Sequence, residues 1–413
     1  MINLFDALRA GEIDAVELSE IATWHFHNAN FSNPTEVLFG LGPDRRTHAL
    51  KFVYRNQCLA QILAGSALKA ADIDTIRATI DRELRAPFRI GTQVFFAVPS
   101  VAGWFRYRDT LQILPVPTGS PLPREAIPFG GQPFLLQFKF RSNQESMLNT
   151  LRRGVQVRKL HLLLNALLEF GIVWLQEGNR FHWVLLPHGA DEPMTTAYCQ
   201  EMYAFPPGLN AGPIADEFRG DSFAPIDGLD PLESVDPQAY YSRQPAISTL
   251  DRKLEVPSNL ETLLDRFFSS SADDRDRFLR ACFWLYHAQT VLQDSSSAGL
   301  TAFLRAVESL MPDPKSTGTC PCCKRSLGRG ARERLREFLD EFAQGSRHSS
   351  ATLYHELRNK LTHGGSLTFS DLNPTVIGLT QRANEERRLR EEVGPIVRVV
   401  LINWLQKRPS ADA

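Results

Sequence analysis

The sequence predicts an α+β protein of 413 residues, with a mixed α/β N-terminal domain followed by an all-α helical bundle that carries a small Cys-containing insertion. Three observations predict this organisation. Residues 1–190 alternate between strand-like and helix-like apolar spacing, residues 191–257 are acidic and rich in Pro and Gly, and residues 258–406 keep helical spacing almost throughout. We therefore expect a mixed α/β domain over residues 1–190, a connection over residues 191–257 and a helical domain over residues 258–406.

In the N-terminal region, apolar residues alternate with polar ones where strands are expected and recur every three or four residues where helices are expected. The predicted strands are Thr47–Tyr54, Thr92–Val98, Phe134–Phe140 and Phe181–Leu186, and the predicted helices are Asp72–Leu84 and Val157–Phe170. A Pro- and Gly-rich loop, Pro115–Pro133, separates two of these strands. His25 and His27 have the spacing of ligands on one face of a strand, but without Cys or carboxylate neighbours we expect ordinary packing or a surface position.

The helical domain is expected to hold five or six helices. The first of them has a capping box, because Glu261 follows Ser258 by three residues. Pro312 ends the third helix, and Gly364 and Gly365 end the fifth. The predicted helices are Ser258–Ser269, a second from Asp273 or Asp274 that includes Phe278 to Leu292, then Ser297–Leu310, Arg329–Phe342, Ser350–His363 and Thr375–Gln406.

Charge is unevenly distributed along the chain, although the total is only −1. Residues 251–413 hold 24 basic and 21 acidic residues, whereas residues 1–250 hold 22 basic and 26 acidic ones. The window 315–336 has seven basic residues and one acid, so the near-zero total does not argue against an RNA partner. The candidate RNA-backbone contacts are Lys324, Arg325, Arg329, Arg332 and Arg336; the alternative is a solvated helix face, since Glu337, Asp340 and Glu341 follow.

Three of the six Cys residues crowd into one short segment, which indicates metal or redox chemistry in a reducing compartment. Cys320 and Cys323 have the spacing of a structural zinc knuckle, with Cys322 and Cys282 as candidate further ligands; the alternative is a thiol-bearing turn without metal. No apolar run reaches the length of a membrane span, and the N-terminus lacks the features of a secretion signal, so we expect a cytoplasmic protein without a membrane partner.

The segment Leu353–Gly365 carries the pattern that points to chemistry. It contains Arg358, the polar Asn359 beside it, and His363 five residues after the Arg at the end of a predicted helix. This pattern resembles the R-x4-6-H motif of HEPN ribonucleases. The order of helices over residues 258–406, about a third of the chain, resembles the ApeA-like HEPN group of bacterial antiphage and abortive-infection proteins.

The resemblance implies metal-independent RNA cleavage, in which a ribose 2′-hydroxyl attacks the adjacent phosphate and leaves a 2′,3′-cyclic phosphate and a 5′-hydroxyl. Such a step needs a group that titrates near neutral pH and a fixed cation for the charge on the phosphate. His363 fits the first role, because a helix C-terminus favours its cationic form. Arg358 fits the second role. Asn359 would orient the phosphate or the imidazole.

The geometry of an α-helix places the side chains of Arg358 and His363 in different directions. Five residues of α-helix turn through about 500° and rise about 7.5 Å, so one regular helix does not direct Arg358 and His363 at the same phosphate. HEPN proteins pair two domains around a shared cleft, so the resemblance implies a homodimer. His355, Asn359 and His363 lie four residues apart and share a face, which makes His355 a candidate auxiliary catalytic residue. The alternative for Arg358 and His363 is a structural helix terminus.

The resemblance therefore implies an endoribonuclease effector of a bacterial antiphage (abortive infection) or toxin system. Its expected substrate is cellular RNA, with tRNA suggested by analogy, and its expected trigger is a phage-derived activator. The N-terminal domain, residues 1–190, would then be the sensor or regulatory domain that senses the trigger or restrains the nuclease. The alternative is a non-catalytic HEPN module that binds RNA or dimerises within a sensor. A toxin controlled by a nucleotidyltransferase partner is disfavoured, because such toxins carry Tyr two residues after the His, where this chain has Gly365.

Overall fold

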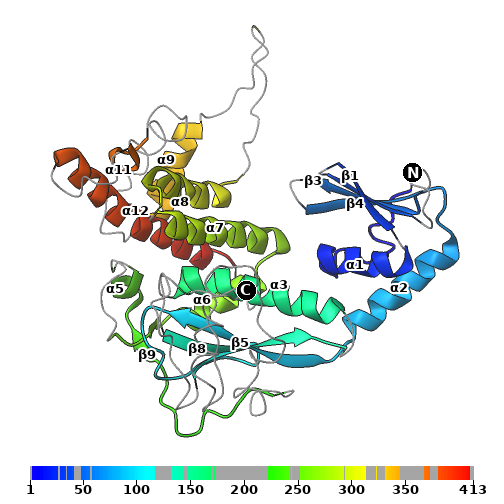
Figure 1. The fold of residues 1–413 in the computed structure, drawn as a ribbon, viewed down its shortest axis with the longest axis horizontal. Helices are drawn as coiled ribbons and strands as arrows, with labels where there is room; N and C mark the ends of the chain where they lie inside the picture. The colour runs from blue at the N-terminus through cyan, green and yellow to red at the C-terminus, as the bar shows by residue number, and fades with distance from the viewer. Residues whose placement is uncertain are drawn as a thin grey trace, which may run out of the picture. The chain divides into compact units, whose positions relative to one another are not determined.

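A computed structural model of the chain combines helices and strands, which confirms the α+β class. The residues that it describes are 2–26, 28–33, 35–40, 48–55, 58–116, 132–143, 147–168, 172, 222–241, 243, 252–292, 294–312, 322, 331–344, 367–372 and 380–409. The fold is shown in Figure 1. No helix within these ranges combines the length and the apolar character that crossing a membrane requires.

The chain divides into two compact units that follow a different division from the predicted domains. Unit 1 comprises Met1–Gly91, Lys139–Val157 and Gly220–Ser222, and unit 2 comprises Thr92–Phe138, Arg158–Arg219 and Phe223–Ala413. Unit 2 thus combines strands from the first 190 residues with the C-terminal helices. Contacts between segments far apart in sequence decide this grouping, whereas the predicted boundaries follow composition alone.

Unit 1 is built on an antiparallel sheet with strand order β1-β2-β3-β4. Its elements are α1 (Ala15–His25), β1 (Asn28–Asn33), β2 (Glu36–Gly40), β3 (Leu50–Arg55), β4 (Cys58–Ala64) and α2 (Ala70–Leu84). The buried side chains of α1, α2 and the strands form one hydrophobic core in which Phe39 and Phe52 are fully buried. The predicted strand over residues 47–54 and the predicted helix over residues 72–84 are confirmed by β3 and α2.

His25 does not lie on a strand. It is the last residue of α1, a helix that begins after Asp14, whose side chain accepts a hydrogen bond from the Val16 amide. The alternative in which His25 and His27 are ligands on one face of a strand is therefore wrong for His25, whereas the expected ordinary packing agrees with its half-buried ring, whose Nε2 lies 3.3 Å from Thr79 Oγ1. His27 lies outside the described residues.

A second four-stranded sheet has the order β5-β8-β7-β6. Its strands are β5 (Phe88–Ala97), β6 (Phe105–Tyr107), β7 (Leu111–Pro115) and β8 (Gln132–Arg141), and α3 (Met147–Leu167) follows β8 in the chain. The predicted strands at 92–98 and 134–140 are confirmed. The helix predicted from Val157 begins ten residues earlier, at Met147. The predicted strand at 181–186 lies outside the described residues, as do most residues of the predicted loop at 115–133.

The last part of the predicted connection has ordered structure of its own. It forms β9 (Glu233–Val235), α5 (Pro237–Tyr241) and β10 (Glu255–Pro257), with β9 and β10 paired in parallel. Residues 223–232 pack on the sheet: the Ala224 amide donates to Gln137 Oε1 (3.0 Å), and the Leu232 amide donates to the Trp104 carbonyl (2.8 Å). The acidic composition of this segment did not predict this packing, because its few apolar residues, Ala224, Ile226 and Leu229, make the contacts with the buried side chains of the sheet.

The described helices of the C-terminal region follow the predicted order. They are α6 (Leu260–Ser269), α7 (Ala272–Val291), α8 (Ser296–Leu310), α9 (Ala331–Phe342), α11 (Phe369–Leu372) and α12 (Gln381–Gln406). Figure 1 shows α7, α8 and α12 packed together. The predicted Ser258 capping box is wrong, because Asn259 precedes the first helical residue and makes no side-chain cap. Ser271, Ser295 and Thr380 do cap their helices with side-chain oxygens.

Candidate functional site

The predicted catalytic residues, His355, Arg358, Asn359 and His363, lie outside the described residues, which resume at Leu367. Three predicted RNA contacts, Lys324, Arg325 and Arg329, and the two main zinc ligands, Cys320 and Cys323, also lie outside them. The structure does describe the residues on both sides of the motif in the chain, namely α9 up to Gln344 and the segment 367–372. Gln344 is thus the last described residue before the motif, and Leu367 is the first described residue after it.

The flank before the motif is held by Asn403 of α12. The Asn403 side-chain amide donates to the carbonyls of Phe342 and Gln344, at 2.8 Å each. These carbonyls lie at the C-terminus of α9, where the last backbone acceptors of a helix lack helical partners. The two hydrogen bonds from Asn403 therefore connect α12 to the C-terminal end of α9. Lys407, the residue directly after α12, forms an ion pair with Glu341 (3.0 Å).

The flank after the motif is held at the N-terminus of α8 by Asp371. The carboxylate accepts hydrogen bonds from the backbone amides of Ser296 (2.7 Å) and Ser297 (2.9 Å) and from the Ser295 hydroxyl (3.0 Å). Burial raises the pKa of Asp371, but the hydrogen bonds from the three serines outweigh it, so the pKa lies below its ordinary value. An ionised carboxylate at the positive end of a helix is favourable.

More hydrogen bonds reinforce this junction of α8, α11 and α12. The Thr368 amide donates to the Ser297 hydroxyl (2.8 Å), and the Ser370 amide donates to Glu386 Oε2 (2.9 Å). Arg390 donates to the Ser296 hydroxyl (3.1 Å). The described chain therefore re-enters the helical bundle at a defined place a few residues after His363. Sequence reasoning missed Asp371; the run of three serines before α8 was a signal for a helix start, but its partner is more than 70 residues away.

The helices that form this framework pack through a buried aromatic and aliphatic core. Phe278 of α7 stacks on Trp404 of α12 with ring centroids 6.0 Å apart. Phe303 of α8 lies against Gly394 of α12, where an added Cβ would come within 3.4 Å of the ring. Glycine at that position permits the close approach of the two helices. The order and packing of α7, α8 and α12 thus depend on apolar residues that the helical periodicity predicts.

The described part of α9 is not a basic surface. Arg336 is exposed, as predicted for an RNA contact, and Arg332 lies within α9. The exposed side chains beside Arg336 are acidic: Glu333, Glu337, Asp340 and Glu341. The Arg334 guanidinium donates to the Pro312 carbonyl (2.6 Å). A basic surface next to α9 would have to include residues from 323–330, which lie outside the described ones.

The two described cysteines among the predicted zinc ligands occupy different environments. Cys282 is fully buried in α7, on the face that also carries Phe278 and Leu285, and burial raises the pKa of its thiol. Cys322 is exposed. Within the described ranges, no group of three or more His, Cys, Asp and Glu side chains is placed to hold a metal ion. The predicted zinc site therefore depends on Cys320 and Cys323.

A buried arginine of α12 joins three segments of unit 2. Arg398 is 6% exposed, and its Nε donates to the Ala166 carbonyl at the end of α3 (3.1 Å). Its guanidinium carbon lies 5.3 Å and 5.0 Å from the ring centroids of Tyr240 and Tyr241. The Tyr241 hydroxyl donates to the Leu167 carbonyl (3.0 Å). Burial lowers the pKa of Arg398, and the two tyrosines together with the α3 carbonyl compensate the charge.

His161 of α3 is a buried histidine that the sequence pattern did not single out. Its Nε2 lies 2.8 Å from the Ile172 carbonyl, and its Nδ1 lies 3.4 Å from Nη1 of Arg158. These neighbours are compatible with a neutral ring that donates through Nε2 and accepts through Nδ1. Burial, assisted by the charge of Arg158, lowers the pKa of His161 to about 4.

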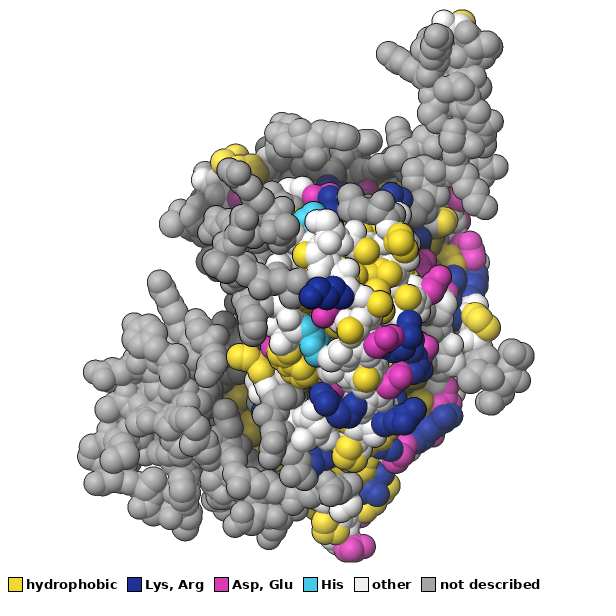
Figure 2. Space-filling view, turned by 90° about the vertical axis from the view of Figure 1, so that its right-hand side faces the viewer, with side chains coloured by type: hydrophobic (Ala, Val, Ile, Leu, Met, Phe, Trp, Pro, Cys, Tyr) yellow, Lys and Arg dark blue, Asp and Glu magenta, His cyan; other side chains and the backbone are white. Residues whose placement is uncertain are grey.

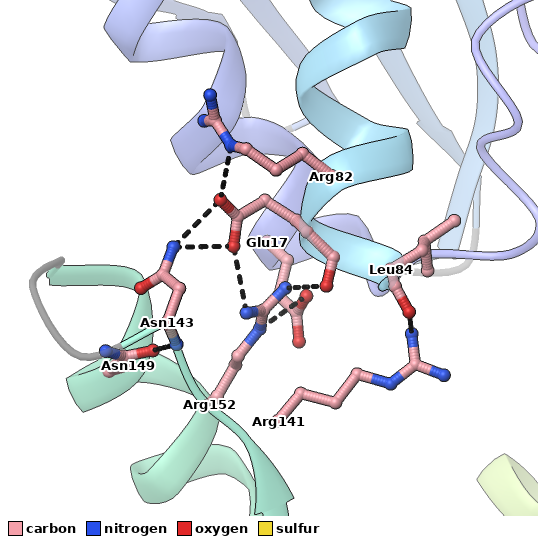
Figure 3. A network of polar contacts seen from close by, with 8 residues as sticks. Glu17, Arg82, Leu84, Arg141, Asn143, Asn149 and Arg152 are labelled. Carbon is pink, nitrogen blue, oxygen red and sulfur yellow. Dashed lines mark hydrogen bonds and ion pairs between the residues drawn. The ribbon is translucent and has the colours of Figure 1, made fainter. Parts of the chain in front are cut away.

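Unit 1 contains a separate polar network, drawn in Figure 3 around Arg152 of α3. Arg152 donates to Glu17 (Nε to Oε2, 3.1 Å) and to Glu83 (Nη1 to Oε2, 3.1 Å). The side chains of Arg152 and Glu83 are 4% and 0% exposed. Asn143 donates to both carboxylate oxygens of Glu83. Burial raises the pKa of Glu17, and the charge of Arg152 opposes that shift.

Figure 2 shows basic and acidic side chains interspersed on the described surface of one face of the molecule. Many of the charged side chains among the described residues, taken over the whole structure, are paired. The ion pairs on exposed or half-buried side chains include Arg9–Asp81, Arg277–Asp273, Arg280–Asp276, Arg305–Glu308 and Arg388–Glu392. Within the described residues, the paired charges do not form an extended positive surface.

Comparison with known proteins gives no match: no family model, no curated protein and no solved structure is similar to the chain.

Proposed function

We propose that this chain is a metal-independent endoribonuclease of the HEPN type, the effector of a bacterial antiphage (abortive infection) or toxin system, with cellular tRNA as its substrate. The observation that carries the proposal is the motif itself. Arg358, Asn359 and His363 stand at the end of a predicted helix that is followed by two glycines. Support comes from α7, α8, α9 and α12, which form at the positions in the chain where the resemblance requires helices.

The chemistry follows from the residue types. His363 transfers the proton of the attacking ribose hydroxyl or supplies one to the leaving oxygen, for which a group titrating near neutral pH is suited. Arg358 contacts phosphate oxygens through its planar guanidinium and stabilises the charge that gathers there. Asn359 orients the phosphate or the imidazole, and His355 assists from the same helix face. Asn403 and Asp371 support these roles indirectly, because they hold the two flanks of the motif segment.

The cleavage test uses purified protein, total tRNA and EDTA. We expect wild type to produce fragments with 2′,3′-cyclic phosphate and 5′-hydroxyl ends, as identified by mass spectrometry, and Arg358→Ala and His363→Ala to abolish them. His25→Ala is a matched control, because His25 also ends a helix but has no proposed role. Cleavage that needs a divalent metal, or that persists in both motif variants, contradicts the mechanism. RNA binding that survives both substitutions without any cleavage by wild type indicates the non-catalytic module instead.

The proposed composite site requires two copies of the chain. Sedimentation equilibrium should therefore give twice the mass of one chain under the conditions in which cleavage is seen. A fully active monomer contradicts the composite site while leaving Arg358 and His363 as catalytic residues to be tested by substitution.

We also propose a structural zinc ion at Cys320 and Cys323, because their spacing suits the tetrahedral coordination of a knuckle. The ion would hold the segment between α8 and α9 and take no part in cleavage. Metal analysis of Cys320→Ser and Cys323→Ser tests this, with the buried Cys282→Ser as a comparison. Equal zinc content in the two knuckle variants and in wild type contradicts a zinc site at these residues.

A further inference from the structure

The solvent-facing side of α7 carries a cluster of rings. Phe283 is 38% exposed, and Trp284 and His287 are half-buried. The three residues lie on the side of α7 opposite its buried face, which carries Ala281, Leu285 and Ala288. The outer side of a helix in a water-soluble bundle ordinarily carries polar side chains, so three neighbouring rings there, one exposed and two half-buried, are a candidate binding surface.

These rings contact one another in a fixed arrangement. Phe283 and His287 are parallel, with centroids 6.0 Å apart and an angle of 4° between their planes. Trp284 stands edge-on to both, at 5.4 Å from Phe283 and 5.8 Å from His287. Within the described part of the chain, no group accepts a hydrogen bond from the Trp284 indole, so its donor is available to a ligand. We call Phe283, Trp284 and His287 the α7 ring cluster.

A cation lies beside the cluster. The guanidinium carbon of Arg158, on α3, is 5.8 Å from the Phe283 ring centroid and 5.7 Å from that of Tyr286. Among the described residues no carboxylate pairs with Arg158, in contrast to Arg280 on the same side of α7, which pairs with Asp276. Charge complementarity therefore favours a ligand that brings its own negative charge.

A ligand that has both flat rings and a negative charge for each ring is a single-stranded nucleic acid. We propose that the α7 ring cluster stacks the bases of single-stranded RNA while Arg158 contacts the adjacent phosphate. Base stacking on aromatic side chains combined with arginine contacts is how proteins hold single strands without reading a particular sequence. The inference rests on the proposed function for the identity of the ligand, and it assigns to that function a substrate class, namely an unpaired loop or end of an RNA.

The test measures binding separately from cleavage. Full-length protein is titrated into a fluorescein-labelled 12-nucleotide single-stranded RNA whose riboses are all 2′-O-methylated, so the attacking hydroxyl is absent. Fluorescence anisotropy gives the dissociation constant. We expect Phe283→Ala and Trp284→Ala each to weaken binding about 5- to 150-fold, the range for loss of one stacked base. Trp284→Phe keeps a ring and should weaken binding less than Trp284→Ala.

Two comparisons separate stacking from charge. An abasic oligonucleotide of the same length should bind wild type and the two alanine variants equally, because it has no rings to stack. Arg158→Gln should weaken the binding of both oligonucleotides. It should also reduce the slope of log K against log salt concentration by roughly one, because one phosphate contact is lost. Phe88→Ala is the matched control, since Phe88 is an exposed phenylalanine (48%) whose ring centroid lies 4.8 Å from a cation, Lys139 Nζ, but which is not part of the cluster. Thermal unfolding of each variant is measured to check that it is folded.

Several results would overturn the proposal. They are unchanged affinity in both alanine variants, an equal loss in Phe88→Ala, equal losses with the abasic oligonucleotide, and absence of RNA binding by wild type. A fall in molecular mass in Phe283→Ala or Trp284→Ala with unchanged RNA affinity would assign the cluster to a contact between copies of the chain instead. Base-dependent binding that requires the cluster in a protein that cuts no RNA keeps this inference and refutes the nuclease. Conversely, RNA cleavage by wild type together with unchanged RNA affinity in the two alanine variants keeps the nuclease and refutes this inference.

Discussion

His161 is expected to make the folded protein sensitive to mild acid. The folded state lowers its pKa from the ordinary value of 6.5 to about 4, chiefly through burial. Below pH 6.5 the unfolded chain binds a proton at this residue, whereas the folded chain stays neutral until about pH 4. The stability contributed by the neutral ring is therefore present above pH 6.5 and is lost as the pH falls toward 4.

The size of the effect follows from the shift. Each pKa unit corresponds to about 1.36 kcal/mol, so the loss reaches about 2 kcal/mol at pH 5 and about 3 kcal/mol near pH 4. The assay is urea unfolding of wild type and His161→Gln at pH 7 and pH 5. Glutamine retains an amide donor for the Ile172 carbonyl and does not titrate. Because both proteins share every other ionisable group, the difference between their pH dependences isolates His161.

We expect wild type to lose about 2 kcal/mol more than His161→Gln between pH 7 and pH 5. His25→Gln serves as a control, because burial lowers the pKa of His25 too but leaves the residue partly exposed, so its effect should be smaller. Equal pH dependence in wild type and His161→Gln would refute the reasoning, since it would mean that the buried ring is protonated in the folded protein or that water reaches it.

Three further substitutions have expected outcomes. Arg152→Met leaves the buried Glu83 with only the largely exposed Arg82 as a described cation and should lower the free energy of unfolding of unit 1 by up to about 3–5 kcal/mol in urea titrations; a loss below about 1 kcal/mol would show that Arg82 or water compensates the carboxylate. Asp371→Asn removes the charge at the α8 N-terminus and should cost about 1–2 kcal/mol at pH 7, with little difference from wild type once the pH falls below the pKa of Asp371; hydrogen exchange at the Ser296 and Ser297 amides checks it, and unchanged protection would contradict it. Tyr241→Phe removes one hydrogen bond to the α3 C-terminus and should cost about 1 kcal/mol in the same unfolding assay, and an effect near zero would mean that the Leu167 carbonyl finds another donor.

Local periodicity determined several elements well. The helices α2, α7 and α8 begin within two residues of their predicted starts, β8 covers its predicted strand, and β3 and β5 overlap most of theirs. Apolar side chains at regular spacing decide these elements, because each element buries one face. The motif containing Arg358 and His363, and the cysteine pair near it, are also properties of the sequence alone, and their roles stay predictions.

Tertiary contacts decided the rest. The first ten residues of α3 lack a regular apolar stripe, and part of their stabilisation comes from Arg152, which is buried against Glu83 69 residues earlier in the chain. Asp371 reaches the α8 N-terminus across more than 70 residues, and Asn403 reaches the end of α9 across about 60. No local pattern encodes such partners, since a carboxylate or an amide looks the same in sequence whether it faces water or a helix end.

The sequence by itself determined the α+β class, the order of the main helices and the motif on which the proposed nuclease function rests. Only the tertiary structure decided that residues 223–241 pack on the second sheet and beside α12, that His161 and Arg398 are buried, and that Arg158 of α3 lies beside Phe283 of α7. The physical reason is the same in each case. Burial and charge pairing depend on which distant segments meet, whereas helix and strand periodicity depend on the nearest few residues.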